Sequence, residues 1–272
     1  MNMRMYLIAA AGAALLALAG CVAPEGTPGR VYDVRAFGAK GDGVASDSAA
    51  IQRALDAAGK TEGTVWIPAG TYLCHDLRVP QRVTVEARGH WTYDGEDHGA
   101  TLLLDSDDAR CVLDITGATG ARITGVQLTG RRDAEKKIHG IMFDNPEKWS
   151  EHEDGIVIDG VKVQYFSGHG LLLNRIWVFA VRHSMFFRNG GSGIALNGWD
   201  GFVLDNQLSD NGDCGLGVTQ FGASVTFTAN RVEWNRKAGL FVDGCDAWNV
   251  TGNCFDHNWG PGVEIKGLTA SS

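Results

Sequence analysis

The second half of this chain repeats itself about every 23 residues, and this period constrains the fold more than any other feature. Each repeat opens with glycine and an apolar–x–apolar triplet, and the triplets begin at Leu171, Ile194, Leu216, Leu240 and Val263. These openings are spaced 23, 22, 24 and 23 residues apart. Two further columns keep the same spacing: Ser184, Asn206, Asn230 and Asn253, and Asn189, Asn211, Asn235 and Asn258. Three columns that share one irregular period indicate a solenoid of stacked repeats.

Inside each repeat, short apolar runs with period-two alternation are separated by glycine, asparagine and aspartate, a pattern typical of strands. We interpret each repeat as one rung of an all-β fold, a right-handed parallel β-helix whose equivalent strands stack about 4.8 Å apart. The first and third residues of each triplet should point into the core. The asparagine columns should lie at the corners, where each carboxamide can bond the same group one rung away.

The rungs before this regular part are harder to recognise. Ile141–Phe143 forms a further opening 30 residues before Leu171, so the rung between them is longer than those that follow. Weaker strand patterns occur at Arg122–Val126 and Thr101–Leu104. Together they predict seven or eight rungs in one domain over residues 31–272, with the regular repeats at about 141–267.

The N-terminus has the pattern of an export signal. One arginine lies within residues 1–5, and the apolar run Tyr6–Leu18 is too short to span a membrane as a helix, so residues 1–20 are predicted to be a signal peptide. The run ends in Leu18-Ala19-Gly20-Cys21, which resembles a bacterial lipobox and implies lipidation of Cys21, with residues 21–30 as a lipidated tether. By the same resemblance, Val22 favours a lipid anchor in the outer membrane of the cell envelope. An ordinary signal peptide is the alternative.

Charge and cysteine content limit the classes of partner and of site that the chain can be expected to have. The net charge of −8 is scattered and no basic stripe is present, so nucleic acid is not an expected partner. Without Cys21, five cysteines remain at irregular spacing, which favours buried apolar roles over a disulfide framework or a metal site. Cys245 and Cys254 form the one pair worth testing for a bridge. Eight tryptophans suit stacking on sugars, although a large core also uses them.

Residues 31–73 form a separate block with a predicted helix at Asp47–Ala58. Asp47 is a good N-cap and Gly59 a good terminator. One apolar stripe contains Ala50, Ile51, Ala54, Leu55 and Ala58. We expect this short helix to cap the first rung and to cover its unpaired strand edge.

The same block carries a family resemblance. It contains Phe37-Gly38-Ala39-Lys40-Gly41-Asp42-Gly43 and, later, Ile67-Pro68-Ala69-Gly70-Thr71-Tyr72. These segments resemble the N-terminal part of the pectate-lyase-like superfamily, in the branch related to polygalacturonases. The resemblance implies a pectin-lyase-like β-helix and, commonly, action on polysaccharides; relatives also include epimerases, phage tailspikes and proteins without known activity. Between the two segments, residues 44–50 depart from the family's usual Thr-Asp-Asp-Thr type of stretch.

Gly168-His169-Gly170 resembles the Gly-His-Gly that polygalacturonases carry just before a strand opening. Hydrolysis in that family needs carboxyl groups on neighbouring rungs, one to protonate the leaving oxygen and one to activate water. The family's Asn-Thr-Asp, Asp-Asp and Arg-Ile-Lys motifs are missing from the corresponding positions, where His139 and Ser192 stand on the neighbouring rungs. The polygalacturonase pattern therefore carries over only at His169, and a plain corner before a strand is the alternative interpretation.

Two columns of one face carry the side chains suited to chemistry. Two residues before each opening stand His139, His169, Ser192, Cys214, Ala238 and Pro261. Three residues after each opening stand Asp144, Asn174, Asn197, Thr219, Asp243 and Lys266. The N-terminal rungs of this face are the better equipped, and a charged insertion that includes Lys137 and Asp154 lies beside them.

These residues suggest chemistry on a uronate. β-Elimination or C5 epimerisation needs the sugar carboxylate neutralised and the neighbouring proton removed. Lys137 or Arg175 could supply the positive charge, and His139 or His169 the base. The predicted substrate contacts are Asn174, Asn197 and Trp199.

Two other site chemistries are compatible with these residue types. A glycosidase needs two carboxyl groups, for which Asp144 and Asp154 are the nearby candidates. A Ca²⁺ site is conceivable at Asp144 and Asn174 but unsupported, because two oxygens fall far short of a calcium shell, and no metal or other cofactor is predicted.

The sequence thus predicts an exported, polysaccharide-active protein, most closely a lyase, glycosidase or epimerase-type enzyme acting on an acidic, uronate-containing polysaccharide. The alternative is a non-catalytic glycan-binding or structural β-helix lipoprotein of the cell envelope. Because few residues follow the last opening, the strand edge at Val263–Gly267 is expected to self-associate with another copy of the chain.

Overall fold

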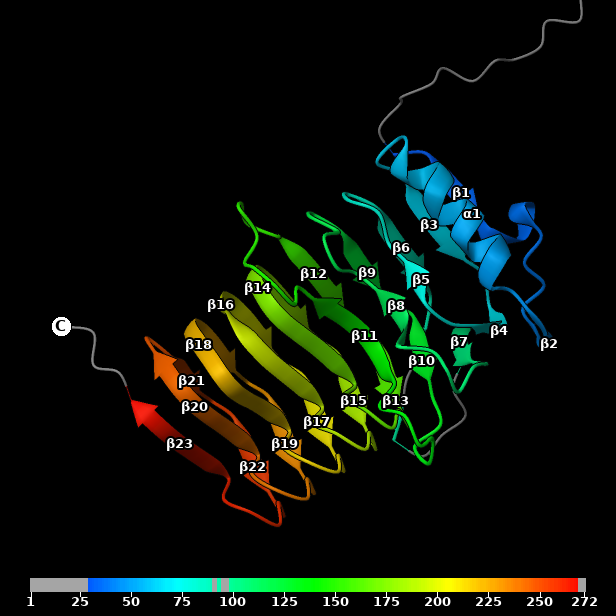
Figure 1. The fold of residues 1–272 in the computed structure, drawn as a ribbon. Helices are drawn as coiled ribbons and strands as arrows, with labels where there is room; N and C mark the ends of the chain where they lie inside the picture. The colour runs from blue at the N-terminus through cyan, green and yellow to red at the C-terminus, as the bar shows by residue number, and fades with distance from the viewer. Residues whose placement is uncertain (1–28, 90–91, 94–97, 269–272) are drawn as a thin grey trace, which may run out of the picture.

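The computed structural model describes residues 29–89, 92–93 and 98–268, which wind into a solenoid of parallel strands (Figure 1). The expected signal peptide and most of the expected tether, including Cys21, lie outside the described residues. Every pair of hydrogen-bonded strands among the described residues is parallel, as the repeat predicts. The expected parallel β-helix is therefore confirmed.

The strands form two sheets, and each sheet takes strands from successive rungs. The nine-stranded sheet contains β2 (Asp42–Ser46), β4 (Gly70–Cys74), β7 (Ala100–Leu104), β10 (Gln127–Thr129), β13 (Lys162–Gln164), β15 (Met185–Phe187), β17 (Gln207–Ser209), β19 (Arg231–Glu233) and β22 (Cys254–Asp256). The 14-stranded sheet contains β1 (Val31–Asp33), β3 (Thr64–Ile67), β5 (Leu77–Arg78), β6 (Thr84–Ala87), β8 (Cys111–Asp114), β9 (Arg122–Thr124), β11 (His139–Asp144), β12 (Ile156–Asp159), β14 (Leu171–Arg182), β16 (Ile194–Leu204), β18 (Leu216–Thr228), β20 (Leu240–Asp246), β21 (Asn249–Thr251) and β23 (Val263–Leu268).

One strand of the smaller sheet belongs to each rung, so the described part of the chain has nine rungs rather than the seven or eight expected. The missed rungs lie in the N-terminal block. Its strands β1 and β3 pair with each other and β3 pairs with β6, so the expected cap forms part of the solenoid itself.

The triplet openings stack as the period predicts. Leu171, Ile194, Leu216 and Leu240 pair in register along β14, β16, β18 and β20, and each is fully buried. Val263 continues this column on β23, where 40% of it is exposed. Burial of these side chains is the main source of stability along the solenoid axis.

The two asparagine columns form hydrogen-bonded ladders inside the corners, as expected. Asn206 donates from Nδ2 to the Val181 carbonyl (2.9 Å) and to Oδ1 of Asn230 (3.0 Å), and its own Oδ1 accepts the Ser184 N–H (3.0 Å). The second column repeats this pattern at Asn189, Asn211, Asn235 and Asn258. Backbone groups that the corners would otherwise leave without partners are satisfied in this way.

A short helix covers the N-terminal end of the solenoid. The helix α1 (Ser48–Gly59) follows a 3₁₀ turn, η1 (Val34–Phe37), and packs its apolar stripe against β1, β3 and β5. The buried Asp47 carboxylate does not cap α1; it accepts the backbone N–H groups of Lys40 (2.7 Å) and Gly41 (3.0 Å). The family-like loop before the helix is therefore fixed by Asp47.

The five cysteines of the described part are free thiols, so the Cys245–Cys254 bridge is not formed; Cys245 is buried and Cys254 exposed. Within these residues, no helix combines the length and apolar character that crossing a membrane requires.

Candidate functional site

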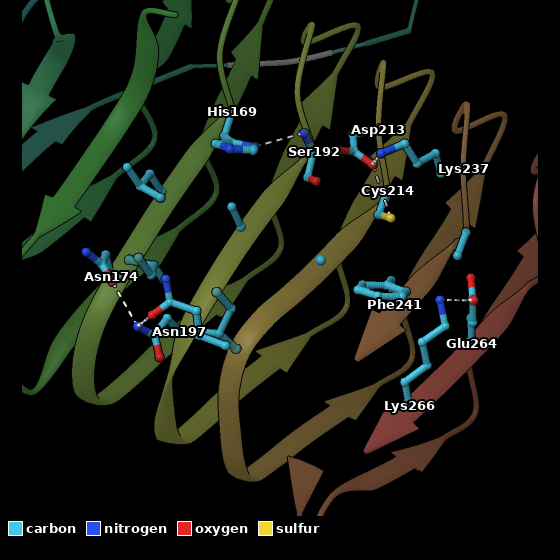
Figure 2. A pocket seen from close by; sticks show the side chains of 17 residues that line it. His169, Asn174, Ser192, Asn197, Asp213, Cys214, Lys237, Phe241, Glu264 and Lys266 are labelled. Atoms are coloured by element: carbon cyan, nitrogen blue, oxygen red, sulfur yellow. Dashed lines mark hydrogen bonds and ion pairs between the residues drawn. The ribbon is translucent and has the colours of Figure 1, made fainter. Parts of the chain in front are cut away.

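A groove of about 530 Å³ lies over the outer face of the first halves of β14, β16 and β18 and of β20 and β23 (Figure 2). Figure 2 shows His169, Ser192 and Asp213 along one side, with Asn174 and Asn197 along the other. The groove therefore follows the two columns that the repeat predicts. Its floor consists of the outward residues of the triplets, including Leu172 and Ala195.

A second hollow, of about 290 Å³, continues this face toward the N-terminus and shares Leu172 with the groove. Its charged and polar lining contains Asp108, Arg110, Lys136, Lys137, His139 and Asp144. The structure thus brings together Lys137, His139, Asp144, His169, Asn174 and Asn197, six of the eight residues expected to react with or contact a substrate.

The two histidines stack across neighbouring rungs. Their ring centroids are 5.2 Å apart and the rings are within 6° of parallel. Nδ1 of His139 accepts the backbone N–H of His169 (3.0 Å), and Nδ1 of His169 accepts that of Ser192 (2.9 Å). Because Nδ1 is an acceptor in both rings, a neutral ring carries its proton on Nε2.

Both histidines are held neutral. Burial, followed by the neighbouring His169, lowers the pKa of His139 to about 4. Burial also lowers the pKa of His169. Near neutral pH this histidine column consequently presents Nε2–H donors rather than imidazolium charges.

The column on the opposite side of the groove is also hydrogen bonded from rung to rung. Asn174 donates to Asp144 (Nδ2–Oδ1, 2.8 Å), and Asn197 donates to both Asn174 (Oδ1, 2.9 Å) and Gln220 (Oε1, 3.0 Å). Asn197 lies outside the core, as expected, but only 8% of it is exposed because its neighbours cover it. We call Asp144, Asn174, Asn197 and Gln220 the outer polar column.

Gln220 and Arg110 are site residues that the sequence pattern did not identify. The register of β18 shifts after Val218, and Gln220 meets Asn197. Arg110 approaches Asp144 (Nη2–Oδ2, 3.3 Å) from an early rung that lacks the regular period.

The C-terminal half of the groove has its charges paired. Lys237 lies 3.1 Å from Asp213, and Lys266 lies 2.8 Å from Glu264. Lys266 also lies 5.1 Å from the centroid of the Phe241 ring. The N-terminal hollow, by contrast, presents Lys137, whose ammonium donates to the Ser167 carbonyl (3.2 Å).

Arg175 and Trp199 lie outside the two hollows. Arg175 donates from Nη1 to the carbonyls of Asn145 (2.7 Å) and Pro146 (2.8 Å). It therefore holds the insertion, the segment between β11 and β12, and does not place positive charge in the groove. Trp199 stacks on Trp149 of the insertion, with centroids 4.3 Å apart and an interplanar angle of 5°. Both contacts fasten the insertion against the solenoid.

Asp154 does not form an accessible carboxyl pair with Asp144. It is 1% exposed, accepts the Trp177 N–H (2.8 Å) and the Ser150 hydroxyl (2.8 Å), and its burial raises its pKa. The carboxyl pair considered for a glycosidase is therefore not available to a substrate. Across the described ranges, no group of three or more His, Cys, Asp or Glu side chains is arranged to hold a metal ion.

Comparison with known families agrees with this architecture. A family model described as "Right handed beta helix region" matches residues 113–271, more than half of the chain. The chain belongs to the right-handed beta-helix family. A second model, "Rhamnogalacturonase A/epimerase, pectate lyase-like", matches residues 31–85 and confirms the resemblance of the N-terminal block.

Two curated relatives match parts of this β-helix chain. Mannuronan C5-epimerase AlgE2 of Azotobacter vinelandii is 28% identical over 257 residues, which cover 86% of this chain and 25% of that protein. A capsule K30/K69-specific depolymerase of Klebsiella phage K5-2 is 48% identical over 115 residues, which cover 36% of this chain and 14% of that protein. The chain thus spans a quarter or less of the length of these relatives.

Solved β-helix structures superpose on most of the chain. The A-module of mannuronan C-5 epimerase AlgE4 of Azotobacter vinelandii gives a TM-score of 0.63 at 20% identity, covering 86% of this chain and 74% of the module. A family 28 exopolygalacturonase of Yersinia enterocolitica gives 0.56 at 15% identity, covering 84% of this chain and 53% of that one. At these identities the likeness establishes the shared fold.

Proposed function

We propose that the two adjoining hollows bind an acidic, uronate-containing polysaccharide and that the chain is a lyase or epimerase-type enzyme. The observation that carries this proposal is the continuous face on which neutral histidine donors, Lys137 and Arg110 surround the accessible carboxylate of Asp144. The relatives support the substrate class, because six of them are named mannuronan C5-epimerases and one is named an alginate lyase.

Lyase and epimerase chemistry share a first step, removal of the proton at C5 next to the sugar carboxylate. Negative charge then builds up on that carboxylate, and fixed donors lower the barrier most when they point at the developing charge. Nε2–H of His139 and His169 can donate to it, and Arg110 and Lys137 add positive charge.

The proton acceptor in this proposal is Asp144. The sequence pattern suggested a histidine base, but the Nδ1 lone pair of each ring accepts a backbone N–H and its Nε2 holds the proton. The Asp144 side chain is 25% exposed, and Asn174 and Arg110 fix its orientation. The glycosidase alternative loses its second carboxyl, because Asp154 is buried.

The test is turnover of polymannuronate and polygalacturonate by the purified chain. A lyase is detected by the absorbance of the new C4–C5 double bond, and an epimerase by exchange of the C5 proton with deuterium from solvent. Asp144→Asn should abolish turnover without a change in melting temperature. Asp243→Asn, an exposed carboxylate at the other end of the same face, is the matched control. Full activity of Asp144→Asn would remove the proposed base.

A non-catalytic glycan-binding role is the second candidate. The paired charges Asp213–Lys237 and Glu264–Lys266 favour it, because such pairs can hold sugar hydroxyls without driving chemistry. Tight binding of a uronate polymer with neither product absorbance nor C5 exchange would establish this role instead.

Export and lipid anchoring remain proposals on sequence grounds. Residues 1–20 would direct export and Cys21 would carry the lipid at the outer membrane. Expression of the full chain in a bacterial host, with mass spectrometry of the N-terminal peptide, tests both. Cys21→Ala should move the protein from the membrane fraction to the soluble fraction.

Self-association through β23 is a further proposed contact. Val263 and Ile265 on this strand are 40% and 46% exposed, and β23 pairs only with β20 among the described strands. Ile265→Lys should convert any concentration-dependent oligomer of the 272-residue chain into a monomer, as measured by light scattering. An oligomer that Ile265→Lys leaves unchanged would assign the contact elsewhere.

A further inference from the structure

A third hollow lies on the other side of the corners that border the groove. Its volume is about 320 Å³, and it lies beside the ends of strands of the nine-stranded sheet. Its lining includes Phe187, Arg188, Asp210, Trp234, Arg236 and Trp259. On the same corners, Asp213 and Lys237 face the groove instead, so the two hollows are separate.

The tryptophans of this hollow are exposed on rigid backbone. Trp234 is 42% exposed and Trp259 is 73% exposed, which is unusual for such large apolar side chains. The backbone N–H of Trp234 donates to the Asp256 carbonyl (3.2 Å), and the backbone N–H of Trp259 donates to the Asn235 carbonyl (2.9 Å). Both rings therefore extend from corners that are fixed by the asparagine ladder. Rings presented in this way lose little conformational freedom when a ligand binds.

Two arginines lie against aromatic rings in the same hollow. Cζ of Arg236 is 4.2 Å from the Trp259 ring centroid, and Cζ of Arg188 is 4.4 Å from that of Phe187. Arg188 also donates to Asp210 (Nε–Oδ2, 3.1 Å). In the part of the chain that the structure describes, no carboxylate lies within ion-pair distance of Arg236. Arg236 thus presents a positive charge without a carboxylate partner among the described residues, in a chain whose net charge is −8.

We infer that this hollow is a second, non-catalytic binding site for an acidic oligosaccharide. The apolar face of a pyranose ring can stack on Trp259 or Trp234, and the guanidinium of Arg236 can bind a sugar carboxylate with two hydrogen bonds. The tryptophans lie on adjacent rungs, one on each side of the Asn235–Asn258 pair. A glycan that crosses from one rung to the next can therefore contact both rings. The site retains a polymer on the chain while another stretch occupies the groove.

The test is calorimetric binding of oligomannuronate, oligogalacturonate and a neutral cello-oligosaccharide of equal length to the whole chain. The Asn174→Ala background weakens groove binding, so that the second site contributes a larger share of the measured binding. In this background, Trp259→Ala and Arg236→Gln should each weaken binding of the acidic oligosaccharides about tenfold, the effect of losing one stacking or one charge-assisted contact. Arg236→Lys should restore only part of the affinity, because an ammonium cannot bind a carboxylate in the same two-pronged way.

Matched controls come from other exposed positions. Phe202 is a 49% exposed aromatic residue on β16, and Arg82 is an exposed arginine in the early rungs that pairs with Glu62. Phe202→Ala and Arg82→Gln should bind as the background does. Unchanged affinity in Trp259→Ala and Arg236→Gln would overturn the inference, and so would equal affinity for the neutral oligosaccharide. Loss of turnover in Asp144→Asn with this binding retained would separate the groove chemistry from the second site.

Discussion

The chain contains two kinds of polar ladder, one inside the corners and one beside the groove, and they differ in uniformity. The inner ladders repeat asparagine from rung to rung, and every Nδ2 of Asn206, Asn211 and Asn230 reaches both a backbone carbonyl and the next asparagine. The outer polar column contains three residue types over four rungs and begins with an accessible carboxylate, Asp144.

This difference separates structural residues from candidate functional ones. A buried ladder must satisfy the same backbone groups on every rung, so asparagine serves at every position of the two columns except Ser184. A column that faces a ligand has no such requirement, and each rung can carry a different group. Heterogeneity within a register column is therefore the better indicator of a binding face in this fold.

Breaking an inner ladder should have the largest effect. Asn230→Leu keeps the approximate size but leaves the Asn206 N–H and the Val203 carbonyl without partners. Each such buried group costs about 1–3 kcal/mol, so the free energy of unfolding should fall by about 3 kcal/mol. Urea unfolding measures it. Asn249→Leu, at an exposed position on β21, should change stability by less than about 0.5 kcal/mol. Equal losses for both variants would contradict a structural role of the ladder.

The histidine column shares features of both kinds of ladder. Its rings accept backbone hydrogen bonds, as the inner ladders do, and they also border the groove. The unfolded His139 ring takes up a proton near its ordinary pKa of 6.5, whereas burial keeps the folded ring neutral until about 4. The contribution of His139 to the free energy of unfolding is therefore fully present above pH 6.5 and is lost as pH falls toward 4.

Comparison with His139→Phe isolates this contribution. The stability of the wild-type chain should fall by about 2 kcal/mol more than that of the variant over this pH interval, since part of the penalty is screened by solvent. Urea unfolding at both ends of the interval provides the measurement. Parallel pH dependences would show that the His139 ring is not held neutral by the fold.

Changing the outer polar column should affect binding more than folding. Asn174→Ala removes the link between Asp144 and Asn197 but leaves Asn197 bonded to Gln220. We expect binding of a uronate polymer to weaken about tenfold, equivalent to about 1.4 kcal/mol, while the free energy of unfolding changes by less than about 1 kcal/mol. Affinity electrophoresis and thermal unfolding measure the two effects. A large stability loss with normal binding would place Asn174 among the structural asparagines.

The regular part of the fold follows from the sequence because stacking requires equivalent positions to repeat. The register of Leu171 with Ile194 follows directly from the period, and the neighbourhood of His139 and His169 follows from their equal distance from the openings at Ile141 and Leu171. The period does not predict the N-terminal rungs, because the strands β1 to β4 belong to a block without it.

The rest of the site depends on backbone detail that composition does not reveal. Arg175 follows Asn174 directly in the sequence, but its side chain reaches Asn145 in the segment between β11 and β12. Its φ is left-handed, 61°, and the strand register shifts between Asn174 and Ile176. Arg110 reaches Asp144 from an irregular rung, and the use of Nδ1 as an acceptor in both histidines depends on how closely neighbouring rungs approach.

The inner ladders also govern how a chain of this kind can change in length over evolution. Each rung passes an identical set of bonds to the next, so gain or loss of one whole rung, as between Asn206 and Asn230, restores every contact. An insertion shorter than one rung cannot stack in register with its neighbours. It must therefore form a loop, as the residues between β11 and β12 do. The length of the groove consequently changes in fixed steps, because duplication of one repeat adds one further rung to it.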